Sequence, residues 1–409
     1  MDSSIIITFA IPLFFGLILI EFFYGVVTKQ NNYRINDAIT SMSLGLISRF
    51  VPILGLGFQY VVYKAVAEHY NFNLLNGEEV WVWVTAFILY DVCYYWMHRI
   101  HHEIKVFWAT HVVHHHGEEF NLSTALRQTS TGFLWKWVFF LPMFIIGIPP
   151  HIYVSVAGLN LVYQFWVHTE HIGRLGFLEY IFVTPSNHRV HHAQNEDYLD
   201  ANYGGVFILW DRLFGTFIDE RTDLKPVYGT VKPLKSFNPF WANIEVFYQM
   251  ILDSYHTKKW KDKIRVWFSP PAWRPDDVKD KYPVDKNDLN NFEKYDPEIT
   301  KTEKIFAFFQ FTMINGLTIL MLFNVDKFSY QEMAGVAILV STLAISNALL
   351  LDGKRYANNI EVVRACAVLV FVYLGFFTNF VYLILGHTII ALIVASIFSL
   401  RFNQARTAR

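Results

Sequence analysis

The sequence predicts an all-α integral membrane protein, a multi-span helical bundle with a polar helical cap on its cytosolic side. Of its 409 residues, 53% are hydrophobic and only 17% are charged, whereas soluble domains carry about 25% charged residues. Apolar runs of roughly 20 residues recur along the chain. A helix of about this length crosses a hydrocarbon core of about 30 Å with its backbone hydrogen bonds satisfied internally.

We expect about nine spans. A final apolar run, 365–400, is long enough for two helices that turn near Thr378 and Asn379. The other seven runs are 5–27, 41–66, 80–97, 133–148, 151–168, 305–323 and 331–351. The first run follows residues with no basic n-region, so we interpret it as a retained span.

The basic residues indicate the orientation of the chain. Most of them fall in 26–40, 98–132, 169–304, 352–364 and the C-terminal tail, and the positive-inside rule places such segments in the cytoplasm. An odd number of spans then leaves the N-terminus outside and the C-terminus inside. This orientation puts the site described below on the cytoplasmic side, in the endoplasmic reticulum of a eukaryote or the inner membrane of a bacterium.

The fourth and fifth runs are short, because the sequence Gly147-Ile148-Pro149-Pro150 interrupts them. A hairpin that re-enters the membrane is the alternative to two full crossings. In both cases the chain returns to the side it left.

We divide the chain into four parts. These are N-terminal spans (1–97), a catalytic region containing the hairpin 133–168 (98–252), a polar segment (253–304) and C-terminal spans (305–409). The polar segment mixes lysines with Trp260 and Trp267, as in helices at an anionic membrane surface. A solvated linker is the alternative.

Composition excludes some partners. The net charge is −1 and no helix-turn-helix or zinc-finger spacing is present, so we expect no nucleic-acid partner. The two cysteines, Cys93 and Cys366, lie in apolar runs, and no disulfide is expected. The sequence leaves the oligomeric state open.

Histidines are concentrated in the middle of the chain, where 13 of the 16 lie between residues 98 and 192. Three groups have the spacings H-x3-H, H-x2-HH and H-x2-HH and begin at His98, His111 and His188. Because residues three and four apart share a helix face, each group can direct its imidazoles at one point. With His168 they exceed the four to six ligands of one ion, which favours two metals.

The position of the histidines suggests the substrate. His98 and His168 each end an apolar run, so the site is expected where membrane meets water, with lipid and O2 at hand. Imidazole suits iron, zinc, copper and nickel alike, so the ligands do not choose the metal. The location favours oxidation of lipid C–H bonds.

Four carboxylates near the histidines are candidates for orienting the imidazoles through their second ring nitrogen. They are Asp91, Glu103, Glu170 and Asp211; ordinary capping or pairing with arginine is the alternative for each. We expect structural or solvated roles for the isolated His69, His151, His256 and His387, and we leave His101, His116 and His171 outside the ligand set.

The three boxes resemble those of the fatty acid hydroxylase and sterol desaturase superfamily of membrane di-iron oxygenases. Between Tyr90 and Phe217 the sequence is similar to the alkylglycerol monooxygenase branch, in the segments YYWMHRIHHE (94–103), WATHVVHH (108–115), NLSTALRQ (121–128), YQFWVHTE (163–170), TPSNHRVHH (184–192) and NYGGVFILWDRLFGTF (202–217).

This resemblance implies two iron ions, tetrahydrobiopterin as reductant and ether lipids as substrate. It implies a role in catalysis for Glu103; Asp91 and Glu170 remain candidates for orienting the ligands on the grounds given above. The implied ligands are His98, His102, His111, His114, His115, His188, His191 and His192, with His168 as a ninth. Candidates for holding the headgroup or pterin are Asn121, Arg127, Gln128, Tyr203, Trp210 and Asp211, with packing of the cap as the alternative.

The hypothesis is therefore hydroxylation of the carbon beside an ether oxygen, which gives a hemiacetal that collapses to a fatty aldehyde and a glycerol derivative. The alternative is a fatty acyl or sterol hydroxylase or desaturase with an electron-transfer partner. A metal transporter is disfavoured, because transporters place ligands near the midplane, often in inverted repeats. A scaffold with incidental histidines is less favoured still.

Overall fold

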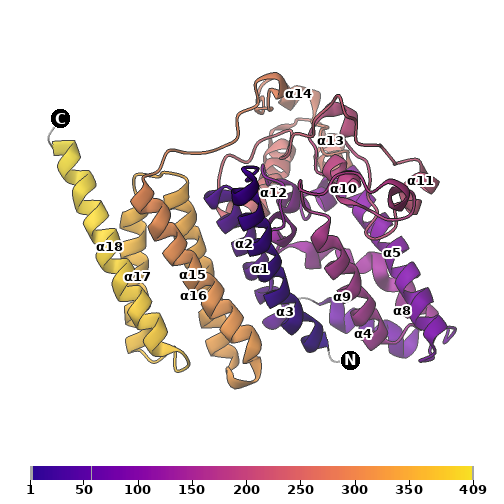
Figure 1. The fold of residues 1–409 in the computed structure, drawn as a ribbon, viewed down its shortest axis with the longest axis horizontal. Coiled ribbons are helices and arrows are strands. Elements are labelled where there is room, and N and C mark those ends of the chain that lie inside the picture. Colours follow the sequence, from indigo (N-terminus) through magenta and orange to yellow (C-terminus); the bar gives the residue numbers. More distant parts are fainter. Residues whose placement is uncertain (1–2, 57, 408–409) are drawn as a thin grey trace. The chain divides into compact units, whose positions relative to one another are not determined.

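The computed structural model describes residues 3–56 and 58–407 (Figure 1). Within that part of the chain every regular element is a helix, apart from two isolated β-bridges, so the predicted all-α class is confirmed there. The residues form two compact units. Unit 1 comprises Met1–Arg34, Gly57–Leu234 and Asn243–Glu293, and unit 2 comprises Ile35–Leu56, Lys235–Ala242 and Lys294–Arg409.

Unit 1 is built on three long helices, α1 (Ser3–Thr28), α5 (Val80–Glu103) and α9 (Pro150–Trp166), and both α1 and α5 pack against α9. Apolar side chains of α5 and α9, among them Val82, Ala86 and Ile152, share a buried core. The remaining α-helices are α4 (Gln59–His69), α6 (Lys105–Trp108), α7 (Val112–His115), α8 (Leu141–Ile146), α10 (Pro185–His191), α11 (Leu209–Phe214), most of α12 (Pro239–His256), α13 (Trp260–Phe268) and α14 (Asp276–Lys279).

Short 3-10 turns connect these helices. They are η1 (Thr124–Leu126), η2 (Gly132–Leu134), η3 (Lys136–Phe140), η4 (Gly176–Tyr180), η5 (Glu196–Tyr198) and η6 (Leu289–Asn291).

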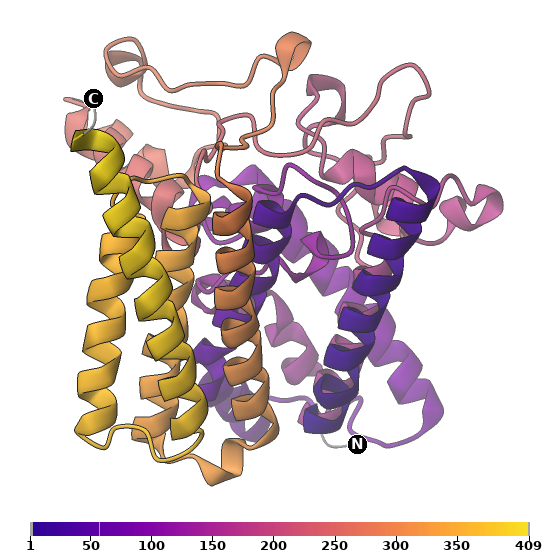
Figure 2. The same cartoon turned by 60° about the vertical axis from the view of Figure 1, so that its left-hand side comes forward.

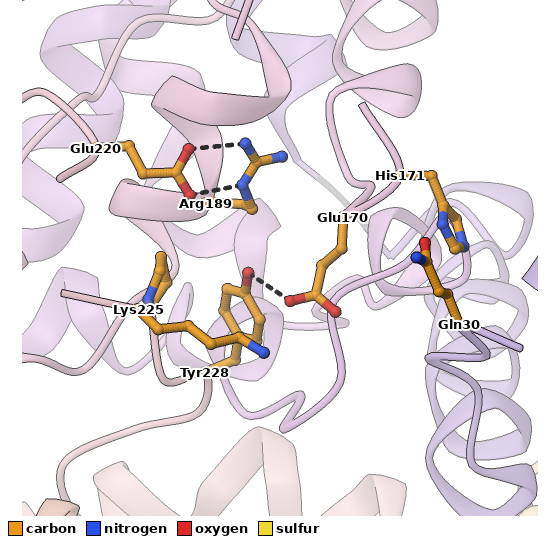
Figure 3. A pocket seen from close by; sticks show the side chains of 8 residues that line it. Gln30, Glu170, His171, Arg189, Glu220, Lys225 and Tyr228 are labelled. Carbon is orange, nitrogen blue, oxygen red and sulfur yellow. Dashed lines mark hydrogen bonds and ion pairs between the residues drawn. The ribbon is translucent and has the colours of Figure 1, made fainter. Parts of the chain in front are cut away.

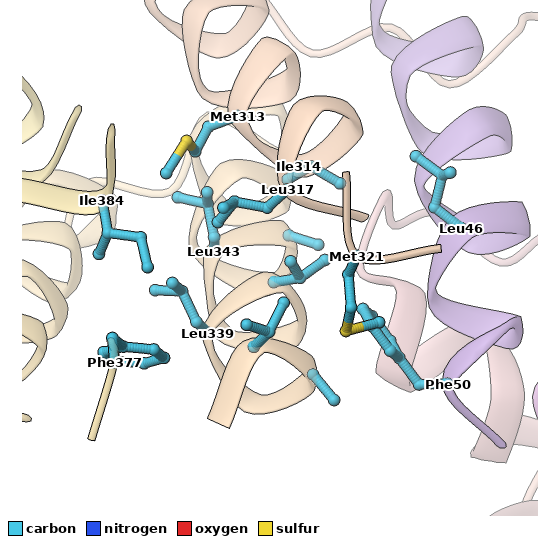
Figure 4. Close-up of a cluster of buried hydrophobic side chains, with 14 of the residues drawn as sticks. Leu46, Phe50, Met313, Ile314, Leu317, Met321, Leu339, Leu343, Phe377 and Ile384 are labelled. Carbon is cyan, nitrogen blue, oxygen red and sulfur yellow. The ribbon is translucent and has the colours of Figure 1, made fainter. Parts of the chain in front are cut away.

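Unit 2 contains α2 (Ile35–Ser48), α3 (Phe50–Ile53), α15 (Lys301–Phe323), η7 (Val325–Lys327), α16 (Tyr330–Leu351), α17 (Ala357–Tyr373) and α18 (Val381–Thr407). The orange to yellow helices, α15 to α18, run alongside one another in Figure 2. Capping boxes start α15 (Thr300 with Glu303) and α16 (Ser329 with Glu332). Figure 4 shows the apolar core, in which Ile314, Leu317 and Leu343 are almost fully buried.

Five helices in the described residues are long and apolar enough to cross a membrane. They are Ala10–Thr28, Val80–Glu103, Lys301–Phe323, Tyr330–Leu351 and Val381–Leu400. They coincide with the predicted runs 5–27, 80–97, 305–323 and 331–351 and with the second half of 365–400. The last run does divide in two, because the chain leaves the helix between α17 and α18, where Thr378 and Asn379 lie.

The predicted run 41–66 is not one helix. The chain is divided there into α2, α3 and α4. Pro52 lies in the short α3, and Gly55, at φ 63°, follows in the left-handed conformation that ends a helix. The continuous apolar composition of this run hid a break that proline and glycine impose.

The run 133–148 is also broken, into η2, η3 and the six-residue α8. Gly147, at φ 108°, ends α8, and α9 begins at Pro150, as the sequence Gly-Ile-Pro-Pro predicts. With 17 residues, α9 is shorter than a typical span. These lengths fit the hairpin alternative better than two complete crossings.

The helix α13 lies in the segment predicted to be polar and interfacial. Its residues Trp260, Ile264 and Phe268, spaced by four, are 81%, 67% and 64% exposed. Lys261 and Arg265 are also exposed on this helix. An exposed apolar stripe between basic side chains is typical of a helix at a membrane surface.

Candidate dimetal centre

The histidine boxes form two adjoining groups in unit 1. In the first, each of five imidazoles offers one ring nitrogen, and these nitrogens lie within 4.8 Å of one another. The five are His98 and His102 from α5, His111 and His115 from the start and end of α7, and His191 from α10. All are buried. The first group therefore draws on all three boxes.

The second group contains four imidazoles whose nitrogens meet the same 4.8 Å limit. His114 comes from α7, His168 follows α9, and His188 and His192 come from α10 and its end. All nine histidines predicted as ligands are thus brought together, five in one group and four in the other. The rings of His115 and His192, one from each group, stack with centroids 4.4 Å apart.

Helical spacing explains the division. Each pair at i and i+4 stays in one group: His98 with His102, His111 with His115, and His188 with His192. Histidines at i+3, which are His114 and His191, cross to the other group. A step of four residues rotates the side chain by about 40° around the helix and a step of three by about −60°, so the two directions diverge.

The helix α10 begins with a capping box in which the side chains of Thr184 and Asn187 satisfy each other's backbone N–H groups. Pro185 occupies its first turn, where a missing N–H costs nothing. This well-defined start fixes the directions of His188, His191 and His192 although the helix has only seven residues.

Backbone carbonyls orient at least four of the rings. The Nδ1 atoms of His98, His191, His114 and His168 lie 2.8, 2.9, 3.1 and 2.8 Å from the carbonyl oxygens of Tyr203, Ala201, Arg127 and Gln164. An Nδ1–H donor at these distances leaves Nε2 unprotonated and directed at the centre. Ligating histidines in metalloproteins are held in this way.

The centre fits metal ions better than a set of hydrogen-bonded histidines. Within the two groups, several Nε2 atoms lie only 3.0–3.2 Å apart, for example in the pairs His98–His111 and His188–His168. The Nε2 atoms of His102 and His191 are buried, and no residue that the structure describes forms a hydrogen bond with them. Converging lone pairs and unsatisfied buried nitrogens are costly unless a cation lies between them.

The protonation states agree with this conclusion. Burial, reinforced by neighbouring histidines, holds the pKa of His111, His115, His188 and His192 well below the ordinary value. Burial lowers the pKa of His191 to about 4. The rings are therefore neutral at pH 7, which is the form that binds metals.

Two of the predicted carboxylates, Asp91 and Asp211, support the histidine centre indirectly, through the loop 201–208. Asp91 is fully buried and accepts hydrogen bonds from the side chains of Asn160 and Trp210 and from the backbone N–H groups of Val206 and Phe207. Asp211 accepts from the N–H groups of Tyr203 and Gly204. They hold the loop 201–208 and not the imidazoles themselves, and that loop presents the carbonyl to which His98 bonds. Burial raises the pKa of Asp211 to about 6.

The other two carboxylates do not reach an imidazole of the centre through any hydrogen bond found in the described residues. Glu103 pairs with Arg99 at 2.8 Å, and its side chain is 41% exposed. Glu170 accepts a hydrogen bond from the Tyr228 hydroxyl at 3.1 Å and lines a surface pocket. Glu103 directly follows His102 and Glu170 lies two residues after His168, but their side chains make contacts elsewhere.

The candidates for headgroup or pterin binding have structural partners. Asn121 donates to the Asn32 carbonyl, Gln128 to the Ala125 carbonyl, and the buried Arg127 to the Val113 carbonyl. Trp210 donates to Asp91. These bonds correspond to the packing alternative.

Tyr203 differs from those candidates. Its hydroxyl is buried and has no hydrogen-bond partner among the described residues, and its ring centroid lies 5.3 Å from that of His102. A free hydroxyl beside the first group is available to a ligand of the centre.

The sequence reasoning missed several residues around the centre. Glu21 on α1 is buried and accepts hydrogen bonds from the Thr169 hydroxyl at 2.5 Å and the Leu122 N–H at 2.8 Å, which ties α1 to the residue after His168. A carboxylate inside an apolar run was the signal that could have revealed it. Phe120 packs on His168 and His192, with ring centroids 5.6 and 5.3 Å apart.

Two histidines left outside the ligand set do lie near the centre. His101 is buried with its ring 6.1 Å from that of His111, and its Nδ1 bonds to the Met97 carbonyl. His116 faces Glu245, with 3.6 Å between Nε2 and Oε1. Neither belongs to the two groups of converging nitrogens.

A comparison with known protein families identifies the class of enzyme to which the chain belongs. Residues 83–216, which contain every histidine of both groups, match the fatty acid hydroxylase family. The chain is an oxidoreductase of the membrane hydroxylase class. No solved structure matches the chain.

Relatives that match over more of the chain define the family. Alkylglycerol monooxygenase of Danio rerio is 33% identical over 365 residues, which cover 88% of this chain and 80% of that protein. The enzymes of that name from Homo sapiens (39% over 267 residues, 65% of this chain) and Xenopus tropicalis (37% over 286 residues, 70% of this chain) match 59% and 64% of their own lengths, less than two thirds. The chain belongs to the alkylglycerol monooxygenase family.

Proposed function

We propose that the protein is a di-iron monooxygenase that uses O2 and tetrahydrobiopterin to cleave the ether bond of alkylglycerol lipids. The observation that supports this most directly is the pair of histidine groups, five and four imidazoles with their nitrogens directed inward. Together with membership of the family, it favours iron over the other metals that imidazole binds.

In this proposal the first group holds one iron and the second group holds the other. His98, His102, His111, His115 and His191 are the ligands of the first ion, and His114, His168, His188 and His192 those of the second. The ions supply activation of O2 for insertion of one oxygen atom into a C–H bond. The protein holds the imidazoles neutral and oriented before the metals bind, which limits reorganisation during the reaction.

The reaction proposed is hydroxylation of the chain carbon beside the ether oxygen. The ether oxygen stabilises electron deficiency at that carbon, which makes its C–H bonds the weakest in the alkyl chain. The hydroxylated product is a hemiacetal, which collapses to a fatty aldehyde and a glycerol derivative. The Tyr203 hydroxyl, buried beside the first group without a partner, is placed to hydrogen-bond an oxygen atom of the substrate or product.

We assign Glu103 a role next to the centre. It follows His102 directly and pairs with Arg99 one turn earlier, so it secures the end of α5 from which two ligands project. Its replacement by glutamine is expected to lower turnover more than iron content, because the ligands themselves remain.

We also propose a placement in the membrane. The centre lies at the C-terminal end of the apolar helix α5, so it faces the cytoplasm if the basic segments lie there. The stripe Trp260, Ile264 and Phe268 of α13 then rests at the lipid headgroups, with Lys261 and Arg265 near their phosphates.

The test is turnover by purified protein in lipid vesicles supplied with an alkylglycerol, O2 and tetrahydrobiopterin. Fatty aldehyde should form only when all three are present. The variant His191→Ala should form aldehyde at least 100-fold more slowly, and His387→Gln, which changes a histidine of unit 2, should match the wild type. Absence of aldehyde together with turnover of a fatty acyl lipid or sterol, driven by an electron-transfer protein, would establish the alternative hydroxylase function.

A further inference from the structure

A polar pocket lies in unit 1 behind the second histidine group. Its volume is about 360 Å³, and the residues on its wall include Glu170, His171, Arg189, Glu220 and Tyr228. Figure 3 shows the Glu170 carboxylate between the Tyr228 ring on one side and the side chains of His171 and Gln30 on the other. The pocket is therefore lined by hydrogen-bonding groups.

Two aromatic rings separate this pocket from the second histidine group. Tyr228 stacks on Phe120 with ring centroids 4.8 Å apart and planes 18° apart. Phe120 in turn packs on His168 and His192. Arg189, which lies on the pocket wall, directly follows His188 on α10. The pocket and the centre thus share a helix and a two-ring wall.

The wall decides what kind of ligand the pocket can serve. A substrate carbon must reach the metal ions to be hydroxylated, and the rings of Tyr228 and Phe120 stand in the way. Electrons need no open path, because they can cross packed aromatic rings. A ligand in this pocket is therefore placed to donate electrons and not to be hydroxylated.

The pocket lining carries both signs of charge, with Arg189 and Lys225 as cations and Glu170 and Glu220 as carboxylates. Both guanidinium edges of Arg189 are already used, by Glu220 at 2.7 and 2.8 Å and by the carbonyls of Thr169 and Ile172. Glu170 forms no ion pair with that arginine; its carboxylate lines the pocket, and its Oε1 accepts a hydrogen bond from Tyr228. A carboxylate binds two parallel N–H groups best, as it does with the guanidinium of arginine.

We propose that this pocket binds the tetrahydrobiopterin of the reaction, with the guanidine-like edge of the pterin ring on Glu170 and the ring near Tyr228. This inference rests on the proposed function, which requires that reductant. In the overall reaction the tetrahydropterin gives up two electrons and two protons and becomes a dihydropterin; these reduce one oxygen atom of O2 to water, and the other oxygen atom enters the C–H bond.

The test is binding of tetrahydrobiopterin to the iron-loaded protein without O2, measured by equilibrium dialysis. Glu170→Gln keeps the size of the side chain but replaces one acceptor oxygen by a donor, and it should weaken binding at least tenfold. Gln30→Trp, which places a larger side chain on the pocket wall and leaves the carboxylate in place, should weaken binding to a similar degree. Iron content should stay at the wild-type level in both variants.

The matched control is Asp219→Asn. Asp219 is the neighbour of Glu220 in sequence, but it pairs with the exposed Arg174 and its side chain is 61% exposed. This variant should bind the pterin within twofold of the wild type.

The outcomes separate the pocket from the proposed function. If both pocket variants bind tetrahydrobiopterin with wild-type affinity, this pocket is not the pterin site, but the proposed pterin-dependent reaction still stands. Failure of the wild-type protein to bind the pterin at all would overturn the pocket and the choice of reductant together.

Discussion

The two units share an apolar composition but differ in what they bury. Unit 1 holds nine imidazoles in two converging groups, eight of them buried, together with the buried Asp91 and Glu21, which accept several hydrogen bonds each. Unit 2 buries mainly apolar side chains around Ile314 and Leu343, and its sequence contains a single histidine, His387. The comparison teaches that unit 1 carries the chemistry of the protein, while the helices of unit 2 are stabilised by packing and capping.

The largest difference is expected from removing a histidine in each unit. His191→Ala takes away a buried nitrogen that has no other partner, so we expect loss of at least one iron per chain and a fall in turnover of at least 100-fold. His387→Gln should keep both at the wild-type level. Elemental analysis and aldehyde release measure the two effects. Equal losses in the two variants would contradict the division of roles.

Acid should destabilise the metal-free protein through unit 1. The pKa of His191 is lowered to about 4 in the folded state, from an ordinary value near 6.5, and those of His111, His115, His188 and His192 are lowered as well. Their neutral form is therefore favoured by folding.

The resulting stability is fully present above about pH 6.5 and is lost as the pH falls towards 4, by up to about 1.4 kcal/mol per pH unit for each such histidine. Thermal unfolding of chelator-treated protein at pH 7.5 and pH 5 measures the effect. A melting temperature that does not change with pH would mean that these imidazoles are not buried as neutral groups.

One buried carboxylate in each unit provides a second pair of variants that tests the different roles of the two units. Asp91→Asn and Glu361→Gln each replace an acceptor oxygen that faces donors by an amide; Glu361 accepts from Ser346 and Arg364 in unit 2. Each change should cost about 3 kcal/mol of unfolding free energy. Only Asp91→Asn should also lower iron content, because the loop it holds presents the carbonyl that orients His98. Loss of iron in Glu361→Gln would show that the effect is general destabilisation.

The smallest effect is expected at a helix start in unit 2. Thr300→Ala removes the capping box of α15 and should cost about 1 kcal/mol of stability. Iron content and turnover should be unchanged. Thermal unfolding of the variant and the wild type measures the change in stability, and metal analysis of the same samples measures the iron content. Loss of iron without loss of stability would contradict the purely structural role given to unit 2.

Much of the centre could be predicted from the sequence, because its ligands follow local spacing. Histidines at i and i+4 must lie on one helix face, and the pairs in α5 and α10 do. The end of α8 at Gly147 and the turn between α17 and α18 also follow from local signals.

What the sequence could not provide depends on contacts between distant segments. Helical spacing explains which histidines of one box share a group, but which boxes meet around each group is set by how α5, α7 and α10 pack together, and no spacing rule gives that. The groups that orient the rings are backbone carbonyls such as that of Tyr203, which every residue has, so nothing in the sequence marks them. We expected carboxylates in that position, but Asp91 and Asp211 instead hold the loop that presents the carbonyl.

The most direct test of the central proposal is the metal content of the intact protein, purified without added zinc and analysed together with the His191→Ala and His192→Ala variants. The two histidine groups predict about two irons per chain in the wild type, with each variant losing metal. A folded wild-type protein that binds no iron, or a single ion removed by both substitutions, would contradict the assignment of one iron to each group.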